Sequence, residues 1–544
     1  MYTVSAEDRL WLQSVKRKLY ARSRDNPDYR FGELWGLVTD PRNLRMAFNR
    51  VQRNRGARTA GIDRITVRRI VQQGAEEYLV AIREELRSGS FHPSPVRRVL
   101  IPKAGKPGVF RPLGIPTVKD RMVQAAMKQI MEPIFEAGFY PTSYGFRPGR
   151  SVRGALAHLK VLLHPGAVKR WNPEEKPPFQ WAVEGDIKGC FDNIGHHPLM
   201  VRVRRRIGDG KLNRLVFAFL KAGVMSETQF IRSDSGSPQG GILSPLLSNV
   251  ALSIIDERYE RQVWPRGGTS GSKRGRPTPT LTDPALITRR ASMNRASDKR
   301  RGLPVFMPIR YADDFVILVS SPDRDPEQAR LLAEQEKSSL ADMLKSQMGL
   351  TLSPEKTLVT PVTSTLRFLG HHLRVRRHPT RRHLTSRLVI PKDRSQRLRR
   401  SIELTFDRST ITETLESRLK RINPILRGWG NFYRHAWGAK RVFTAIDNYV
   451  WWTIKRWLRK KHPDTKMDKL AAQYGWHKPR QKALRWRDRG TVPVPLAAIR
   501  VVRYRLGSDP GPHYASTSRE SPVRNERRTP GSARGIRKPS GSNP

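Results

Sequence analysis

Two adjacent acidic residues interrupt an otherwise apolar run, "RYADDFVILV", at residues 310–319. Consecutive side chains of a β-strand point to opposite faces, so an unbroken strand would bury either Asp313 or Asp314 without a partner. A lone buried carboxylate is so unfavourable that it usually takes up a proton. The run therefore predicts two buried strands joined by a tight hairpin, with both acids at its tip and facing a solvent-lined cleft.

A second predicted strand, in "WAVEGDIKGCFDNI", ends at another acid, Asp186. Three carboxylates that meet at strand ends would repel one another and raise their own pKa values. A divalent cation removes that cost. Mg²⁺ prefers oxygen ligands, and two such ions about 3.5–4 Å apart promote phosphoryl transfer. Asp-Asp is also a common turn sequence, and the motif alone leaves that alternative open.

The charge balance indicates a polyanionic partner. Lys and Arg number 103 against 48 Asp and Glu, which gives a formal net charge of +55 over 544 residues. Such an excess repels itself unless a polyanion neutralises it, and the phosphates of nucleic acid are the natural candidate. An anionic membrane surface is the alternative, but no long basic amphipathic helix dominates the sequence. Ribosomal or nucleoid packaging proteins are usually much smaller.

Cysteine content and hydropathy indicate in which cellular compartment the protein is found. Cys190 is the single cysteine of the chain, which excludes intrachain disulfides and Cys-based zinc sites. No apolar run reaches the roughly 18 residues needed to span a bilayer. Acids stand near the N-terminus where a signal peptide would have an apolar core. We therefore expect a cytoplasmic protein with no membrane partner.

Apolar spacing and turn residues divide the rest of the chain into segments. Helices are expected over residues 6–50, between the loop "NRGARTAGID" and residue 86, and over "VKDRMVQAAMKQIMEPIFE". A basic hairpin is expected over residues 96–116. Residues 264–304 are polar, basic and poor in aromatics, which predicts an inserted mobile loop.

The C-terminal part differs in composition. After residue 394 the pattern is helical, with aromatic residues interleaved with basic ones. From about residue 507 the chain is rich in Gly, Pro, Ser and Arg, which is typical of a disordered tail.

Several ordered blocks carry a family resemblance. They are "RPLGIPTVKDRMVQ", "SYGFRPGRS", "DIKGCFDNI", "GSPQGGILSPLLSNVAL", "YADDF", "GLTLSPEKT" and "FLGHHL". In wording and order they resemble the successive blocks of reverse transcriptases, specifically the enzymes encoded within bacterial group II introns. Upstream, "NRGARTAGIDRITV" is similar to the extra N-terminal block of that family, and residues 418–462 resemble its maturase domain. The resemblance covers about residues 30–500.

This resemblance implies an α+β fold, the right-hand polymerase of fingers and palm followed by an all-helical thumb or maturase region. Residues 1–95 would form an N-terminal helical extension of the fingers. Residues 96–375 would form the fingers and palm, with the basic insertion at about 264–304. The thumb and maturase domain would occupy residues 394–506, and residues 507–544 would form the disordered basic tail.

The resemblance also assigns catalytic and nucleotide-binding roles. Asp186 and Asp313 are expected to hold two Mg²⁺ ions together with the main-chain carbonyl of Ile187, and Asp314 is the third catalytic acid. The residues implied to contact the dNTP are Lys103, Arg111, Phe191, Gln239 and Lys356.

Each nucleotide-binding role rests on family chemistry. Lys103 and Arg111 would grip the triphosphate, and Phe191 would lie under the sugar, where its ring excludes a 2′-OH. Gln239 would approach the templating pair, and Lys356 would protonate the departing pyrophosphate. Each residue also has a structural alternative. Lys103 and Arg111 could be solvated surface, and Phe191 could pack below the strand end. Gln239 could belong to an ordinary turn, and Lys356 could form a surface pair with Glu355. The "FLGHH" segment would lie by the primer end, where adjacent histidines suggest a metal pair but are more often simple surface.

In the helical region, the basic and aromatic pattern alone favours a bundle with a solvated basic face. Beside a polymerase palm, RNA binding through phosphate contacts and stacking is favoured instead. The residues expected to bind RNA are Arg427, Trp429, Arg434, Lys440, Arg441, Lys455 and Arg456.

The expected function is that of an RNA-directed DNA polymerase and splicing maturase. Its partners would be group II intron RNA, an RNA template, a DNA primer or target, and dNTPs. A splicing-only maturase and a domesticated reverse transcriptase of the retron or defence type are the alternatives, although the latter generally lack the maturase-like block. Many relatives carry a C-terminal HNH nuclease. Because no such block is seen here, we expect no second-strand nicking and hypothesise priming from replication-fork ends.

Overall fold

A computed structural model describes residues 2–102, 108–164, 176–225, 230–231, 236, 240–265, 284–378, 384–477 and 484–502. Within these residues the protein is α+β and has two hydrophobic cores. The larger core is formed by the N-terminal helices and a central sheet with the helices around it, and the second lies among the C-terminal helices. None of the helices described is both long and apolar enough to cross a membrane. Lys103, Gln239, residues 266–283 of the predicted insertion and the predicted tail all lie outside the described residues.

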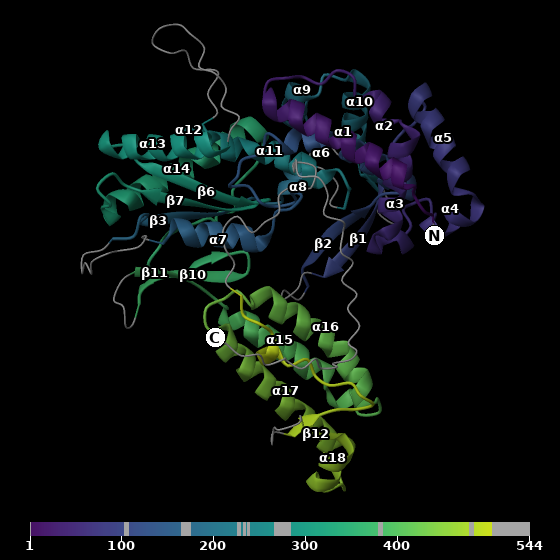
Figure 1. Ribbon diagram of the computed structural model, residues 1–544, viewed down its shortest axis with the longest axis vertical. Coiled ribbons are helices and arrows are strands. Elements are labelled where there is room, and N and C mark those ends of the chain that lie inside the picture. The colour runs from purple at the N-terminus through teal and green to yellow at the C-terminus, as the bar shows by residue number, and fades with distance from the viewer. Residues whose placement is uncertain are drawn as a thin grey trace, which may run out of the picture.

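The N-terminal helices pack around helix α6 (Val118–Glu136), which is buried on nearly every side (Figure 1). The helix predicted over residues 6–50 is present in separate pieces. Helix α1 (Ala6–Asp25) ends before Pro27, and α3 (Pro41–Arg53) starts anew at a proline behind the N-cap Asp40. Proline fits the first turn of a helix but breaks its interior. The neighbouring elements are α2 (Trp35–Val38), η1 (Arg55–Arg58), α4 (Val67–Gln73) and α5 (Ala75–Ser88).

The predicted basic hairpin is present. Strands β1 (Val96–Pro102) and β2 (Phe110–Ile115) are antiparallel, and Pro102 pairs with Phe110. Two short strands, β4 (Val224–Met225) and β5 (Phe230–Ile231), extend this sheet in the order β2-β1-β4-β5.

A second sheet, in the order β6-β7-β3-β8, forms the centre of the larger core. Its strands are β3 (Trp181–Asp186), β6 (Val305–Tyr311), β7 (Asp314–Ser320) and β8 (Leu358–Pro361), and each antiparallel pair is in defined register. Helix α14 (Pro326–Met348) packs on β3, β7 and β8, whereas α7 (Val152–Leu162) lies between β6 and β11 (Leu384–Val389). The remaining helices around this sheet are α8 (Cys190–Asn193), α9 (His196–Arg206), α10 (Gly210–Lys221), α11 (Ser244–Arg258) and α12 (Glu260–Val263).

The prediction of a loop over the whole insertion is wrong for its second half. Residues Pro284–Arg300 form helix α13, which packs against α12 and β6. Only a narrow stripe of α13 is apolar, since Ile287 and Ala291 are each 1% exposed. Asp298 is buried as well and accepts hydrogen bonds from Arg261 and Gln262. Because α13 is attached largely through the hydrogen bonds of Asp298, its sequence lacks the apolar periodicity of a helix. This explains why a loop was predicted.

The C-terminal region holds the second core. Helices α15 (Lys392–Thr405), α16 (Leu415–Tyr433), α17 (Ala439–Lys461) and α18 (Met467–Tyr474) surround buried side chains such as Phe443 and Trp457. The region is not all-helical as predicted, because β12 (Gly475–His477) and β13 (Leu484–Trp486) form a small sheet. The indole of Trp486 fixes this sheet to α17 by donating to the Trp451 carbonyl at 3.0 Å. The C-terminal region also contains two short 3₁₀ helices, η2 (Arg408–Thr410) and η3 (Leu496–Ala498).

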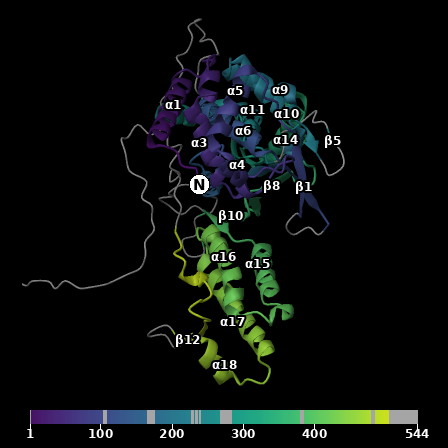
Figure 2. The same cartoon turned by 90° about the vertical axis from the view of Figure 1, so that its right-hand side faces the viewer.

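Direct hydrogen bonds join the C-terminal helices to the rest of the protein. A three-stranded sheet of β9 (Leu366–Phe368), β10 (His371–Arg377) and β11 lies at the junction. The Tyr433 hydroxyl donates to the Gly370 carbonyl at 3.0 Å, and the Trp437 amide donates to Leu388 at 2.6 Å. Both views show the helical bundle projecting below the two sheets (Figures 1 and 2).

Candidate active site

The predicted hairpin is present, and a two-residue turn forms its tip. Tyr311 at the end of β6 pairs with Asp314 at the start of β7, which leaves Ala312 and Asp313 as the turn. Ala312 has φ +57°, a left-handed conformation that hairpin turns usually assign to glycine. An alanine in this conformation is strained, so the surrounding structure must hold it there.

Strand pairing brings the upstream acid to the same place. Asp186, the last residue of β3, is directly opposite Asp314 in the antiparallel register of β3 and β7. Residues directly opposite each other on neighbouring strands have Cβ atoms about 4.5–5.5 Å apart. The three acids singled out by the sequence therefore lie at one end of the central sheet.

The electrostatics of this corner reflect its crowded negative charge. Burial raises the pKa of the Asp313 carboxyl and Asp186 raises it further, whereas the charges of Arg111 and Lys356 oppose the increase. Desolvation, followed by the charges of Asp313 and Asp186, raises the pKa of Asp314 to about 6. Lys356 Nζ lies 2.5 Å from Asp186 Oδ2 and offsets part of the charge.

The acids fit a divalent cation but are not gathered around one. Across the described parts of the chain, no three His, Cys, Asp or Glu side chains are close enough together to hold a metal ion as they stand. One of the three carboxylates, that of Asp186, is instead paired with Lys356. Carboxylate oxygens on adjacent strand ends are the hard donors that Mg²⁺ prefers, so these residues suit the ion.

The raised pKa of Asp314 has a consequence for stability in the absence of metal. Below about pH 4 the carboxyl is protonated in both folded and unfolded protein, and its stabilising effect is lost as the pH rises through about 6. Asp314→Asn should therefore raise the melting temperature of metal-free protein at pH 7–8 and leave it unchanged near pH 4. Because Asp314 faces solvent, screening should limit the effect to less than about 1 kcal/mol.

Thermal unfolding in EDTA across this pH range measures that effect, with Asp323→Asn as the matched control. Asp323 is an exposed aspartate just beyond the far end of β7. A gain for Asp314→Asn that is equal at pH 4 and pH 8 would contradict the explanation.

The backbone after Asp186 is also held in place. Ile187 forms an isolated bridge with Leu352, and the Ser353 amide donates to the Asp186 carbonyl at 2.8 Å. These contacts tie the segment to residues 351–353, close to Lys356. Metal binding by the Ile187 carbonyl stays a prediction.

The structure places two further predicted nucleotide contacts near the acids and adds one aromatic residue. Arg111, on β2, is exposed and close enough for its charge to lower the pKa of Asp313. Phe191 follows the β3 end on α8, and its ring lies 6.0 Å from that of Phe146, which is 47% exposed. Phe146 is not among the site residues predicted from the sequence, although it stands within the "SYGFRPGRS" block.

The two adjacent histidines of "FLGHH" do not form a metal pair. His371 is 2% exposed and packs against the rings of Phe432 and Tyr433 at 5.0 and 4.9 Å. Burial lowers its pKa to about 4, so the ring is neutral near pH 7. His371 therefore belongs to the junction with the C-terminal helices.

Several of the predicted RNA-binding residues contact other residues of the protein. Trp429 is partly buried and packs against the second core, with its ring centroid 5.8 Å from that of Phe443. The Lys440 ammonium donates to the Ile499 carbonyl at 3.1 Å. The Arg434 guanidinium contacts the ring of its neighbour His435, and Lys455 lies over Trp452. Arg427, Lys440, Arg441 and Arg456 are exposed. Of these, Lys440 and Arg456 also donate hydrogen bonds within the bundle.

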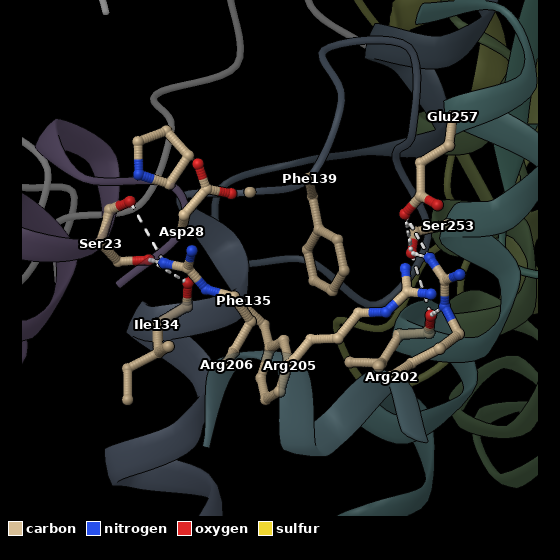
Figure 3. A pocket seen from close by; sticks show the side chains of 13 residues that line it. Ser23, Asp28, Ile134, Phe135, Phe139, Arg202, Arg205, Arg206, Ser253 and Glu257 are labelled. Atoms are coloured by element: carbon tan, nitrogen blue, oxygen red, sulfur yellow. Dashed lines mark hydrogen bonds and ion pairs between the residues drawn. The ribbon is translucent and has the colours of Figure 1, made fainter. Parts of the chain in front are cut away.

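A separate cavity of about 380 Å³ lies between α1, α6, α9 and α11 (Figure 3). Arg202 and Arg206 line it, but Arg202 pairs with Glu257 and Arg206 donates to Ser23. None of the three strand-end acids lines this cavity. It is therefore not the site formed by the hairpin.

Comparison with known proteins places these features in a family. Residues 101–373 match the reverse transcriptase (RNA-dependent DNA polymerase) family, and residues 395–475 match the maturase-specific domain of group II introns. The chain is 34% identical over 373 residues to Protein YkfC of Escherichia coli K12, an alignment that covers 66% of this chain and 88% of that protein.

Intron-encoded proteins are also similar to it. The group II intron-encoded protein LtrA of Lactococcus lactis subsp. cremoris is 34% identical over 388 residues, which cover 68% of this chain and 61% of LtrA. An uncharacterized 91 kDa protein in the cob intron of Schizosaccharomyces pombe is 30% identical over 444 residues, covering 75% of this chain and 51% of that protein. The chain thus spans less than two thirds of the length of either intron protein.

Proposed function

Because the chain belongs to the group II intron reverse transcriptase and maturase family, we propose that it copies RNA into DNA at the Asp186, Asp313 and Asp314 corner and binds its intron RNA through the C-terminal helices. Binding would assist splicing, and the copying would serve retrohoming. The observation that supports the polymerase half most strongly is the direct pairing of Asp186 with Asp314 beside the Asp313 turn.

Each residue of the corner has a defined task in this proposal. Asp186 and Asp313 would hold two Mg²⁺ ions, with Asp314 alongside and the Ile187 carbonyl completing the ligand set. The bound ions would activate the primer 3′-hydroxyl and stabilise the leaving oxygen. Strand pairing and the turn would bring these oxygen ligands to one end of the sheet, and the carboxylates would close around the ions as Lys356 leaves Asp186.

Basic and aromatic residues would bind the nucleotide. Arg111 reaches the corner from the fingers hairpin and would bind the triphosphate. Phe191, with Phe146 beside it, would lie under the sugar and disfavour a 2′-OH. Lys356 is paired with Asp186 and becomes free to meet the departing pyrophosphate once a cation takes its place on that carboxylate. Lys103 and Gln239 keep their proposed roles from the family resemblance.

The C-terminal helices present a surface suited to RNA. Arg427 on α16, and Arg441 and Arg456 on α17, are exposed cations on the bundle. Two tryptophans are exposed as well, Trp437 at 61% and Trp452 at 54%. Arg387 lies 4.6 Å from the Trp437 ring centroid and Lys455 lies 4.9 Å from that of Trp452. Aromatic rings with adjacent cations provide both base stacking and phosphate contacts.

Intron RNA binding should depend on these exposed arginines. Replacing Arg427, Arg441 and Arg456 together with Gln should reduce the slope of log affinity against log salt by about 2–3, since each lost phosphate contact removes roughly one counterion. Primer extension on a short template should remain within about twofold, because the acidic corner is untouched. Filter binding to intron RNA at several salt concentrations, together with a splicing assay, measures the effect.

The matched control removes three exposed or partly exposed arginines from the α13 region, Arg289, Arg300 and Arg301. That variant has the same net charge but keeps the bundle surface intact. Equal losses of slope in the two triple variants would contradict a specific role for the bundle and indicate only the general effect of charge.

A further inference from the structure

A fully buried arginine lies directly beneath the acidic turn. Arg310, in β6 and two residues before Ala312, is 0% exposed, and so is its ion-pair partner Asp256 on α11. Arg310 Nη2 lies 2.6 Å from Asp256 Oδ2, and Nε donates to the same carboxylate at 3.1 Å. Burying an arginine requires that its charge and all its donors find partners.

Every N–H group of Arg310 is used, and the partners come from separate segments. Besides its bonds to Asp256, Arg310 donates from Nη1 to the Ala312 carbonyl and to Asn249 Oδ1, each at 3.1 Å. Nη2 donates to the Ser143 hydroxyl at 2.7 Å. A planar guanidinium holds its partners in a fixed geometry, so the position of the Ala312 carbonyl is set by α11 and by the Ser143 segment.

The second partner on α11 extends the network to the opposite side of the turn. Asn249 and Asp256 are seven residues apart, so both lie on one face of the helix. Asn249 Nδ2 donates to the Gly145 carbonyl at 2.7 Å. Gly145 in turn packs on the turn itself, since a Cβ placed there would lie 2.2 Å from the Ala312 nitrogen. Ala312 is therefore held through its carbonyl on one side and at its nitrogen on the other.

The contacts made by Arg310 and Gly145 meet at Ala312, the residue of the hairpin turn whose backbone is strained. Ala312 has the strained positive φ, and Asp313 follows it immediately. A two-residue hairpin turn does not itself require a buried ion pair, and such pairs often add little stability compared with apolar side chains of similar size. The network therefore has a more specific consequence than stability, namely the orientation of the residue after Ala312.

We propose that Arg310, Asp256 and Asn249 are positioning residues that fix the Ala312 turn and thereby aim the Asp313 carboxylate for the polymerase reaction. They touch neither substrate nor metal. The inference rests on the proposed catalytic role of Asp313. It also gives a role to Ser143 and Gly145 of the "SYGFRPGRS" block and to Asn249 of "SNVAL", which the proposed function does not use.

The test removes the ion pair without leaving a buried charge. Arg310→Met combined with Asp256→Leu replaces both members with apolar side chains, which preserves folding far better than either single change. Misplacement of a catalytic group by about 1 Å lowers rates by roughly 10²-fold. We expect kcat for single-nucleotide incorporation to fall by about that factor, with the KM for dNTP nearly unchanged and the Mg²⁺ concentration for half-maximal rate raised several-fold. Direct Mn²⁺ binding, followed by electron paramagnetic resonance, should weaken in parallel.

A matched pair on the same helix serves as the control. Arg258 pairs with Glu336 of α14 at 2.6 Å, two residues along α11 from Asp256. Arg258→Met with Glu336→Leu makes the same exchange away from the turn, and we expect its kcat and Mn²⁺ binding to match those of the unaltered protein. Equal losses in the two double variants would overturn the proposal, since they would reflect general weakening of the palm.

A second variant keeps the test decisive if the first double variant does not fold. Asn249→Leu leaves the Arg310–Asp256 ion pair in place but removes the hydrogen bonds that Asn249 donates to Gly145 and accepts from Arg310. It should show the same loss of kcat and of Mn²⁺ binding. Normal kcat and Mn²⁺ binding in this variant, or in a folded Arg310→Met/Asp256→Leu protein, would overturn the proposal. Asp313→Asn is measured alongside. If Asp313→Asn is inactive while the positioning variants are active, this inference alone fails; if Asp313→Asn is active, the proposed function fails.

Discussion

Replacing Asp313 with Asn is expected to lower primer extension by at least about 10³-fold. The amide has nearly the shape of the carboxylate but carries no charge, so it is a poor ligand for Mg²⁺. Metal ions contribute several kcal/mol of transition-state stabilisation, and about 4 kcal/mol corresponds to 10³-fold in rate. Single-nucleotide incorporation on an RNA template with a DNA primer, dNTPs and Mg²⁺ measures the loss.

Two controls make this result specific to the corner. Asp323→Asn makes the same chemical change at an exposed aspartate beyond the far end of β7, and its extension rate should be unchanged. Intron RNA binding by Asp313→Asn should also be unchanged, because the exposed arginines of the bundle are intact. Extension by Asp313→Asn at more than a tenth of the normal rate would refute the catalytic assignment.

The second large effect is expected for Gly145→Ala. A Cβ at this position would lie 2.2 Å from the Ala312 nitrogen and 2.8 Å from the Tyr311 carbonyl carbon, both of which are backbone atoms. Hydrogen bonds restrict the movement of both segments, because Asn249 donates to the Gly145 carbonyl and Arg310 donates to the Ala312 carbonyl. The turn must therefore shift, and we expect extension to fall by about 10²-fold, as for other small misplacements of catalytic groups.

Gly428→Ala is the matched control for that substitution. Gly428 lies in α16, and a Cβ added there meets no atom within 4 Å. Alanine favours the helix over glycine by about 1 kcal/mol, so this variant should be slightly more stable and equally active. A Gly145→Ala protein with the normal extension rate and Mg²⁺ dependence would show that the turn tolerates displacement.

Local sequence patterns predicted the parts of the fold that depend on local chemistry. The apolar run around Asp313 and Asp314 indicated a buried hairpin, because only a turn keeps both acids out of the core, and the hairpin is present. The direct pairing of Asp186 with Asp314 was not predictable at that level. Their register depends on how β3 enters the sheet between β7 and β8, which is a tertiary property.

Other features left no local signal. Helix α13 is anchored by the buried Asp298 rather than by an apolar stripe, so it reads as a polar loop. In a chain with 103 Lys and Arg residues, Arg310 resembles any surface arginine, although it is wholly buried. Trp429 was expected to bind RNA because tryptophans alternate with basic residues there. Its ring is partly buried and packs against Tyr433 and Phe443 beside the second core, a contact that the alternating pattern did not indicate.

The most direct measurement is the location of bound metal. Crystals of the protein with an RNA template, a DNA primer, a non-hydrolysable dNTP analogue and Mn²⁺ would reveal the ions by anomalous scattering. We expect two peaks about 3.5–4 Å apart, bridged by carboxylate oxygens of Asp186 and Asp313, with Lys356 Nζ released from Asp186. Metal peaks bound elsewhere, with Lys356 still paired to Asp186 while the nucleotide is in place, would contradict the assignment of these acids as the polymerase centre.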